Sequence, residues 1–128
     1  MATKIFLGLS ALLWLPYGIF CFFQPDFLAG AAGVASTSAT GTTELRAMYG
    51  GLQAGIGALA LLALFRPGLQ GPALVTLAFL CGGLALARLS GTILAAELSA
   101  YTVSGLVIEL ASLGFASWLL SRRPAFSA

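Results

Sequence analysis

The stretch that decides the fold is YTVSGLVIELASLGFASWLL, residues Tyr101–Leu120. It carries a single charged residue, Glu109. About 20 apolar residues is the length that an α-helix needs to cross the hydrocarbon core of a membrane. Three further stretches share this character, at residues 5–23, 46–65 and 72–95. The sequence therefore predicts an all-α protein, a single domain over residues 1–128 that forms a four-transmembrane-helix bundle.

The composition of the chain supports a membrane protein. Hydrophobic residues make up 59% of the 128 residues and charged residues 8%, and the mean hydropathy is +1.01. Soluble domains carry about 25% charged residues, so a chain this apolar would not keep its surface in water. The lipid bilayer is thus the first expected partner.

Several classes of function are disfavoured. The net charge is only +2, which is too small for a nucleic-acid-binding surface. The chain has no His and two Cys, so we expect no metal site, no cofactor and no catalytic triad. Cys21 and Cys81 lie at different depths in their helices, and we expect both to be free thiols.

The first apolar stretch has two interpretations. Lys4 and the small residues Ala29–Ala31 resemble the ends of a cleaved signal peptide. However, the run is long for such a peptide, and its aromatic residues suit a permanent span. We expect residues 24–43 to form the one long outer loop, with a short interfacial turn of helix beginning at Pro25.

Basic residues predict the orientation of the chain. One side of the membrane receives Lys4, Arg66, Arg122 and Arg123. Basic loops stay in the cytoplasm, so both termini are expected to be cytoplasmic, in a multi-pass protein of the bacterial inner membrane. Arg46, near the outer surface, is the exception.

Each predicted helix carries one polar stripe, and the stripes are expected to face the bundle interior. At a rise of about 1.5 Å per residue, Arg88 and Glu109 lie at similar depths, about 10 to 14 Å below the outer ends of their helices. An isolated charge at such a depth costs at least about 2.5–3.5 kcal/mol, which predicts an ion pair. The pair either fixes helix register or belongs to a pocket open to the outer leaflet.

The candidate ligand-binding cluster in the outer half of the bundle comprises Arg46, Tyr49, Gln53, Arg88 and Glu109. The secondary candidates are Glu44, Tyr17, Tyr101 and Thr102. Glu44 also has a structural interpretation, as a carboxylate at the start of the second helix beside the positive end of the helix dipole. Tyr101 also suits an aromatic belt at the membrane interface.

Small residues on the second and third predicted helices, residues 46–65 and 72–95, predict close helix packing. They recur as Gly51-xxx-Gly55 and Gly83-xxx-Ala87-xxx-Gly91. Such steps let helix backbones approach one another within a membrane. The same residues would suit an interface with a partner membrane protein or with a second copy of the chain.

The segment Thr43–Gln53, TELRAMYGGLQ, resembles a family of small bacterial four-helix membrane proteins that is catalogued as a domain of unknown function. The likeness extends to Ala87–Gly91 and to Glu109, and covers nearly the whole chain. It implies recurring polar positions at Glu44, Arg46, Tyr49, Gly50, Gln53, Arg88 and Glu109. It implies no activity.

Four functions remain open. The first is a binding module for a lipid or small amphiphile, with Arg46 and Arg88 on its polar end. The second is a scaffold subunit beside a larger membrane protein. An enzyme using Glu109 or Tyr49 as acid or base is less well supported, because the sequence identifies no catalytic constellation. A proton-coupled transporter would need polar residues in the inner half of the bundle, where there are few.

Overall fold

The computed structural model describes residues 1–122, so Arg123, one of the four basic residues used for orientation, lies outside the described residues. The regular secondary structure of the described residues is helical, and they contain no strand. It folds as two compact units. One comprises Leu7–Pro67, and the other joins Met1–Phe6 to the chain from Gly68 onward.

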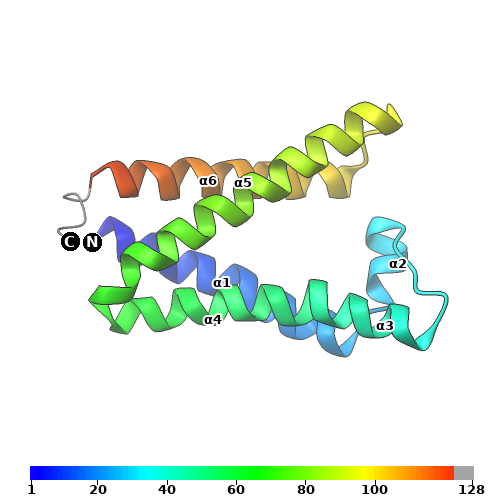
Figure 1. Cartoon of the computed structure of the whole chain (residues 1–128), viewed down its shortest axis with the longest axis horizontal. Helices are drawn as coiled ribbons and strands as arrows, with labels where there is room; N and C mark the ends of the chain where they lie inside the picture. Colours follow the sequence, from blue (N-terminus) through cyan, green and yellow to red (C-terminus); the bar gives the residue numbers. More distant parts are fainter. Residues whose placement is uncertain (123–128) are drawn as a thin grey trace. The chain divides into compact units, whose positions relative to one another are not determined.

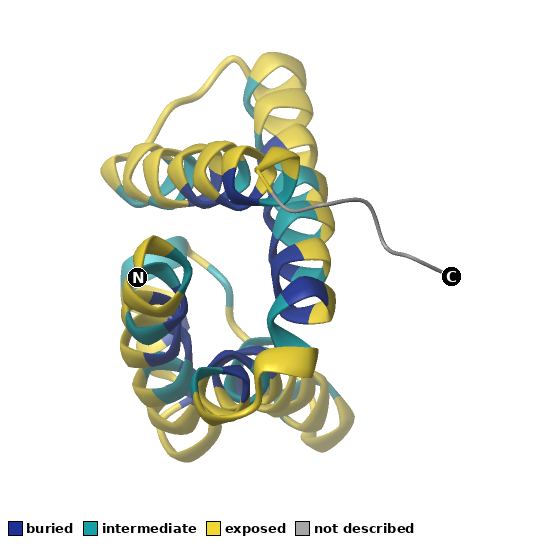
Figure 2. Cartoon of the chain, turned by 90° about the vertical axis from the view of Figure 1, so that its left-hand side faces the viewer, coloured by how far each residue is buried: buried dark blue, intermediate teal, exposed yellow. Residues whose placement is uncertain are grey.

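Four long helical segments are apolar enough to cross a membrane, as predicted. They cover Ala2–Phe23, Ala39–Phe65, Pro67–Ala95 and Ala100–Ser121. The most apolar 18-residue stretch of each segment has a mean hydropathy between 1.6 and 2.0. Between 22 and 33% of the residues in each stretch are buried. Buried residues follow one side of each long helix and leave the other side exposed (Figure 2). Four such helices indicate a multi-pass membrane protein.

The first unit is built on α1 (Ala2–Phe23) and on a second helical stretch running α3 (Ala39–Leu45), η1 (Arg46–Gly51) and α4 (Leu52–Phe65), all visible in Figure 1. Glycine makes the contact between α1 and α4. A Cβ at Gly18 would strike the backbone of Ala54, and a Cβ at Gly57 would strike the backbone of Leu15. The two helices therefore pack backbone against backbone.

Packing between α1 and α4 does not use the predicted small residues. Among the described residues, and apart from the adjoining backbone of the same helix, nothing lies within 4 Å of a Cβ placed at Gly55, and one at Gly51 meets the Arg46 carbonyl oxygen at 3.9 Å. Gly50 and Gly57 take the role instead. Seven residues apart, they lie on one face of the helix. The prediction of close packing through Gly51 and Gly55 is thus wrong for this contact.

The second helical stretch begins seven residues earlier than expected. Ser38 is the N-cap of α3, and its side chain accepts a hydrogen bond from the Gly41 N–H at 3.0 Å. This cap satisfies one of the N–H groups that a helix start leaves unpaired. Glu44 consequently lies in the last turn of α3, exposed, and the predicted dipole role at a helix start is wrong.

The predicted short turn of helix is present as α2 (Phe27–Ala32). Asp26 is its N-cap, so Pro25 precedes the helix rather than opening it. Leu28 is fully buried, and the rings of Phe20 and Phe27 meet edge to face at 5.1 Å. These apolar contacts hold the loop against the end of α1. Because α2 and α3 occupy much of residues 24–43, that segment is a shorter loop than expected.

The second unit pairs α5 (Gln70–Ala95) with α6 (Ala100–Ser121). A short 3-10 turn, η2 (Pro67–Leu69), leads into α5, and residues 96–99 form the tight connection to α6. The two helices are antiparallel neighbours: Arg88 contacts Gly105, while a Cβ at Gly82 would lie 3.5 Å from Leu113 (Figure 1). Ser99 caps α6 by accepting a hydrogen bond from the Thr102 N–H at 3.1 Å.

Candidate functional site

The predicted ion pair between Arg88 and Glu109 is present. Arg88 Nε donates a hydrogen bond to Glu109 Oε1 at 2.8 Å. The two partners differ sharply in exposure, because 27% of the Arg88 side chain is accessible against 3% of the Glu109 side chain. The pair thus joins a buried anion to a cation that reaches the surface of the α5–α6 unit.

A glycine makes room for the guanidinium. Arg88 Cζ and Nε lie 2.9 Å from the position that a Cβ at Gly105 would occupy. Gly105 precedes Glu109 by four residues, so both lie on the same face of α6. The Arg88 guanidinium therefore lies directly over the α6 backbone, where any other residue would crowd it.

Tyr101 completes this face one turn earlier. Its ring centroid lies 5.7 Å from Arg88 Cζ, within the range of a cation–π contact. Tyr101, Gly105 and Glu109 follow one another at steps of four residues, and together they hold the guanidinium along α6. Tyr101 thus has a role at the pair, beside the interface role that the sequence also allows.

The carboxylate of Glu109 is only half satisfied. Oε1 accepts the hydrogen bond from Arg88, whereas Oε2 is buried and has no hydrogen-bond partner among the described residues. Ser112 and Cys81 are also buried in this unit. A buried acceptor without a donor is costly, and such exceptions in a folded protein call for an explanation.

Arg46 has a different environment in the α1–α4 unit. Its Nε donates a hydrogen bond at 3.2 Å to the carbonyl oxygen of Phe22, in the last turn of α1. That carbonyl is one of those that a helix end leaves without an intrahelical partner. Gly50 packs against the same residue, since a Cβ placed on Gly50 would lie 2.8 Å from Phe22 Cβ. Arg46 is therefore a cap for α1.

The segment that carries Arg46 has an unusual backbone. η1 is a π-helix of six residues, and the Leu52 N–H that follows it bonds to the carbonyl of Ala47. Such wide turns are rare and often occur at functional sites. The π-helix coincides with the sequence RAMYGG, which belongs to the segment Thr43–Gln53 that resembles the family. The sequence did not predict this wide turn.

The remaining candidates are distributed over both units. Tyr49 and Gln53 are half-buried on η1 and α4, and Tyr17 is half-buried on α1. Gln53 Oε1 is buried without a hydrogen-bond partner among the described residues, as is Trp14 Nε1. Thr102 is half-buried, and its hydroxyl lies 2.9 Å from that of Ser99 at the start of α6. Within one unit, the structure brings together Arg88, Tyr101 and Glu109.

Two residues were missed as site residues by the sequence analysis. Gly105 precedes the charged Glu109 by one helical turn, and this position was the signal. Trp14 lies within the first apolar helix. Its unpaired indole N–H is a feature of packing that a single sequence does not reveal.

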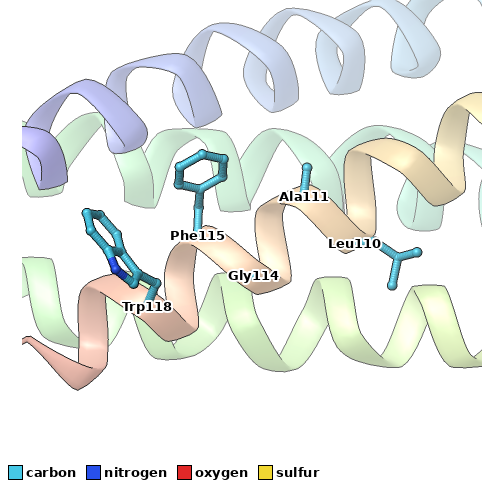
Figure 3. Close-up of a pocket in the computed structure, with 5 residues that line it drawn as sticks. All are labelled: Leu110, Ala111, Gly114, Phe115 and Trp118. Atoms are coloured by element: carbon cyan, nitrogen blue, oxygen red, sulfur yellow. The ribbon is translucent and has the colours of Figure 1, made fainter.

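A groove of about 410 Å³ runs along α6 and contains none of the predicted site residues. Its lining is apolar, with Ala111 and Phe115 projecting to one side of the helix in Figure 3. The lining residues are Leu110, Ala111, Gly114, Phe115 and Trp118. At 100° per residue this face is opposite the one that buries Glu109 and Ser112. The groove is therefore separate from the ion pair.

Comparison with known proteins identifies a family but no activity. No curated protein and no solved structure matches the chain. The family model described as a domain of unknown function (DUF4345) matches residues 2–120. This match covers nearly the whole chain and all four apolar helices, which confirms the resemblance to such a family, and the chain therefore belongs to the DUF4345 family.

Proposed function

We propose that this multi-pass membrane protein binds a lipid or small amphiphile, whose polar head is held by Arg88 on the α5–α6 unit. The observation that carries the proposal is the asymmetry of the ion pair, with an accessible guanidinium and a buried counter-ion. Glu109 and Gly105 fix the position of the cation, and Tyr101 flanks it. A cation that is held in place but remains accessible is suited to receive a ligand.

The chemistry of arginine indicates the type of head group. The ion pair uses Nε, and a guanidinium carries four further N–H donors in a fixed planar arrangement. This geometry matches phosphate and carboxylate oxygens. Charge-assisted hydrogen bonds of this kind strengthen in a region of low dielectric constant. We therefore expect an anionic head group, with the apolar chain of the ligand in the surrounding lipid.

Native mass spectrometry of the purified protein tests the proposal. Wild type should retain a small molecule that Arg88→Ala loses and Arg88→Lys retains only in part, because lysine keeps the charge without the planar donors. Arg122→Ala is the matched control, since Arg122 follows α6 in the same unit, with its Cζ 4.6 Å from the centroid of the Trp118 ring. Equal ligand occupancy in wild type and Arg88→Ala would contradict the proposal.

We also propose that the protein lies in a bacterial inner membrane with both termini in the cytoplasm. Lys4 near the start of α1, Arg66 after α4 and Arg122 after α6 support this orientation under the positive-inside rule. Labelling of single cysteines introduced at Lys4 and at Glu97 by an impermeant reagent tests it in intact cells. We expect labelling only of the cysteine at position 97. Labelling only of the cysteine at position 4 would show that the chain has the opposite orientation.

A scaffold role is the second candidate, and the uncontacted glycines favour it. In the described part of the chain, no atom beyond the adjoining backbone of the same helix lies within 4 Å of a Cβ placed at Gly55, Gly83 or Gly91. Small residues on exposed membrane helices permit close approach by another helix. Gly55→Leu or Gly83→Leu should then abolish capture of a membrane partner while leaving the fold intact. A strictly monomeric wild type without any partner would exclude this role.

A further inference from the structure

The Arg88–Glu109 pair is electrically neutral and lies well inside its helices. Glu109 is nine residues from the first residue of α6, and Arg88 is seven residues from the last residue of α5. At about 1.5 Å per residue these positions lie roughly 10 to 14 Å from the helix ends. At such a depth a net charge is unfavourable, whatever its sign.

An anionic head group that binds Arg88 disturbs this neutrality. The site would then hold one cation and two anions, because Glu109 already occupies Arg88 Nε. The cost of one uncompensated charge inside a membrane corresponds to a loss of affinity of the order of a hundredfold. An anion would bind weakly unless another positive charge enters with it.

The structure provides a place for that charge, since Glu109 Oε2 is buried and has no hydrogen-bond partner among the described residues. A proton on Oε2 neutralises the carboxylate without requiring a new cation. The neutral acid also holds Arg88 less strongly, which leaves the guanidinium to the incoming anion. The half-satisfied carboxylate thus becomes a proton-binding group.

Among the described residues of the α5–α6 unit, Arg88 and Cys81 interact with Glu109. Arg88 is its ion-pair partner. The Cys81 thiol on α5 is fully buried and interacts electrostatically with Glu109. The Tyr101 ring contacts Arg88. The unpaired Oε2 of Glu109 is therefore the position assigned to the proton.

We propose that binding of an anionic amphiphile at Arg88 is coupled to the uptake of one proton by Glu109. This inference rests on the proposed ligand site at Arg88. The ion pair, the anion and one proton from solution give an Arg88–anion pair and a neutral Glu109 acid, so the charge of the site is unchanged. The protein would take up an amphiphilic acid as anion plus proton.

The test uses a fluorescent long-chain alkanesulfonate and the full-length protein in nanodiscs. A sulfonate stays anionic at every pH used, so any pH dependence belongs to the protein. Between pH 6 and 9, wild-type affinity should fall about tenfold per pH unit while Glu109 is ionised in the free protein. Calorimetry in two buffers of different ionisation enthalpy should find one proton taken up per sulfonate bound.

Variants separate this coupling from binding itself. Glu109→Gln should bind the sulfonate with the same affinity at every pH, and at pH 8 more tightly than wild type by at least about tenfold. Glu97→Gln is the matched control, because it removes an exposed carboxylate from the α5–α6 connection and should leave the wild-type slope unchanged. Should Glu109→Gln fail to fold, the proton count on wild type decides alone.

The outcomes distinguish the two proposals. Binding that depends on Arg88, shows no pH dependence and takes up no proton would overturn the coupling and leave the ligand site standing. Absence of any binding that depends on Arg88 would overturn both. Affinity that falls with pH equally in wild type and Glu109→Gln would place the proton elsewhere and overturn the role of Glu109.

Discussion

The two helix pairs of this protein are held together by different interactions. Along α1 and α4 the backbones touch, at Gly18 and at Gly57. Along α5 and α6 an ion pair links Arg88 to Glu109, and a glycine makes space for a side chain instead of a backbone. In the α1–α4 pair, the backbone atoms of the two helices fill the contact and, among the described residues, leave no charged group there. The α5–α6 pair leaves a charged group partly exposed, which is the arrangement expected of a site that receives a ligand.

The two arginines show the same difference. Arg46 Nε bonds to the carbonyl of Phe22 and so completes a helix end, a role that involves only the chain itself. Arg88 bonds to a carboxylate that keeps one buried oxygen unpaired. Residues of the same type on apolar helices can thus have opposite roles, and their hydrogen-bond partners distinguish them.

The largest effect is expected from breaking the ion pair. Arg88→Ala leaves the Glu109 carboxylate buried without a cation, and the loss of one partner of a buried pair costs about 3–5 kcal/mol. Steric trapping or SDS unfolding of the reconstituted protein at pH 7 measures this. Arg122→Ala, the control, should cost less than about 1 kcal/mol. If the two variants were equally stable, the pair would be energetically irrelevant to the fold.

The next effect tests the backbone contact of the first unit. Gly57→Ala places a Cβ against the backbone of Leu15, which cannot move without shifting α1, and overpacking of this kind costs about 1–3 kcal/mol. Gly55→Ala, two residues earlier, meets no atom within 4 Å and gains the better helix propensity of alanine. The same unfolding assay compares them. A similar free energy of unfolding for both would show that α1 and α4 are not in backbone contact.

A smaller effect is expected for the glycine of the second unit. Gly105→Ala meets the end of a flexible side chain, so the Arg88 guanidinium shifts and the cost in stability is about 1 kcal/mol. Ligand occupancy should fall more visibly, because the added methyl group displaces the guanidinium from its position over the α6 backbone. Gly114→Ala on the same helix is the control, because its Cβ would meet no side chain or other helix within 4 Å among residues 1–122. Unchanged ligand occupancy in Gly105→Ala would mean that ligand binding does not depend on the position of the Arg88 guanidinium.

The smallest effect separates the two arginines. Arg46→Ala removes one exposed hydrogen bond to the end of α1 and should cost about 1 kcal/mol, without changing ligand occupancy. Native mass spectrometry and hydrogen exchange of the last turn of α1 provide the two measurements. Loss of the ligand in this variant would return Arg46 to the binding site that the sequence first suggested.

The sequence by itself determined the helices and the ion pair. Long apolar runs must be helical in lipid, and two opposite charges at one depth must meet, because neither an unpaired backbone nor an unpaired charge is tolerated there. The sequence also contains a signal for the early start of α3, because Ser38 is a residue type that caps helix N-termini and it accepts the hydrogen bond from the Gly41 N–H.

Only the tertiary structure decided which glycines carry the packing, that Arg46 caps α1, and that Gly105 makes space for a guanidinium. Each of these depends on what another helix places opposite the residue. Helical periodicity fixes the face on which a residue lies but not the atom it meets. The asymmetric burial of Arg88 and Glu109, on which the proposed function rests, likewise arises from how α5 and α6 pack together.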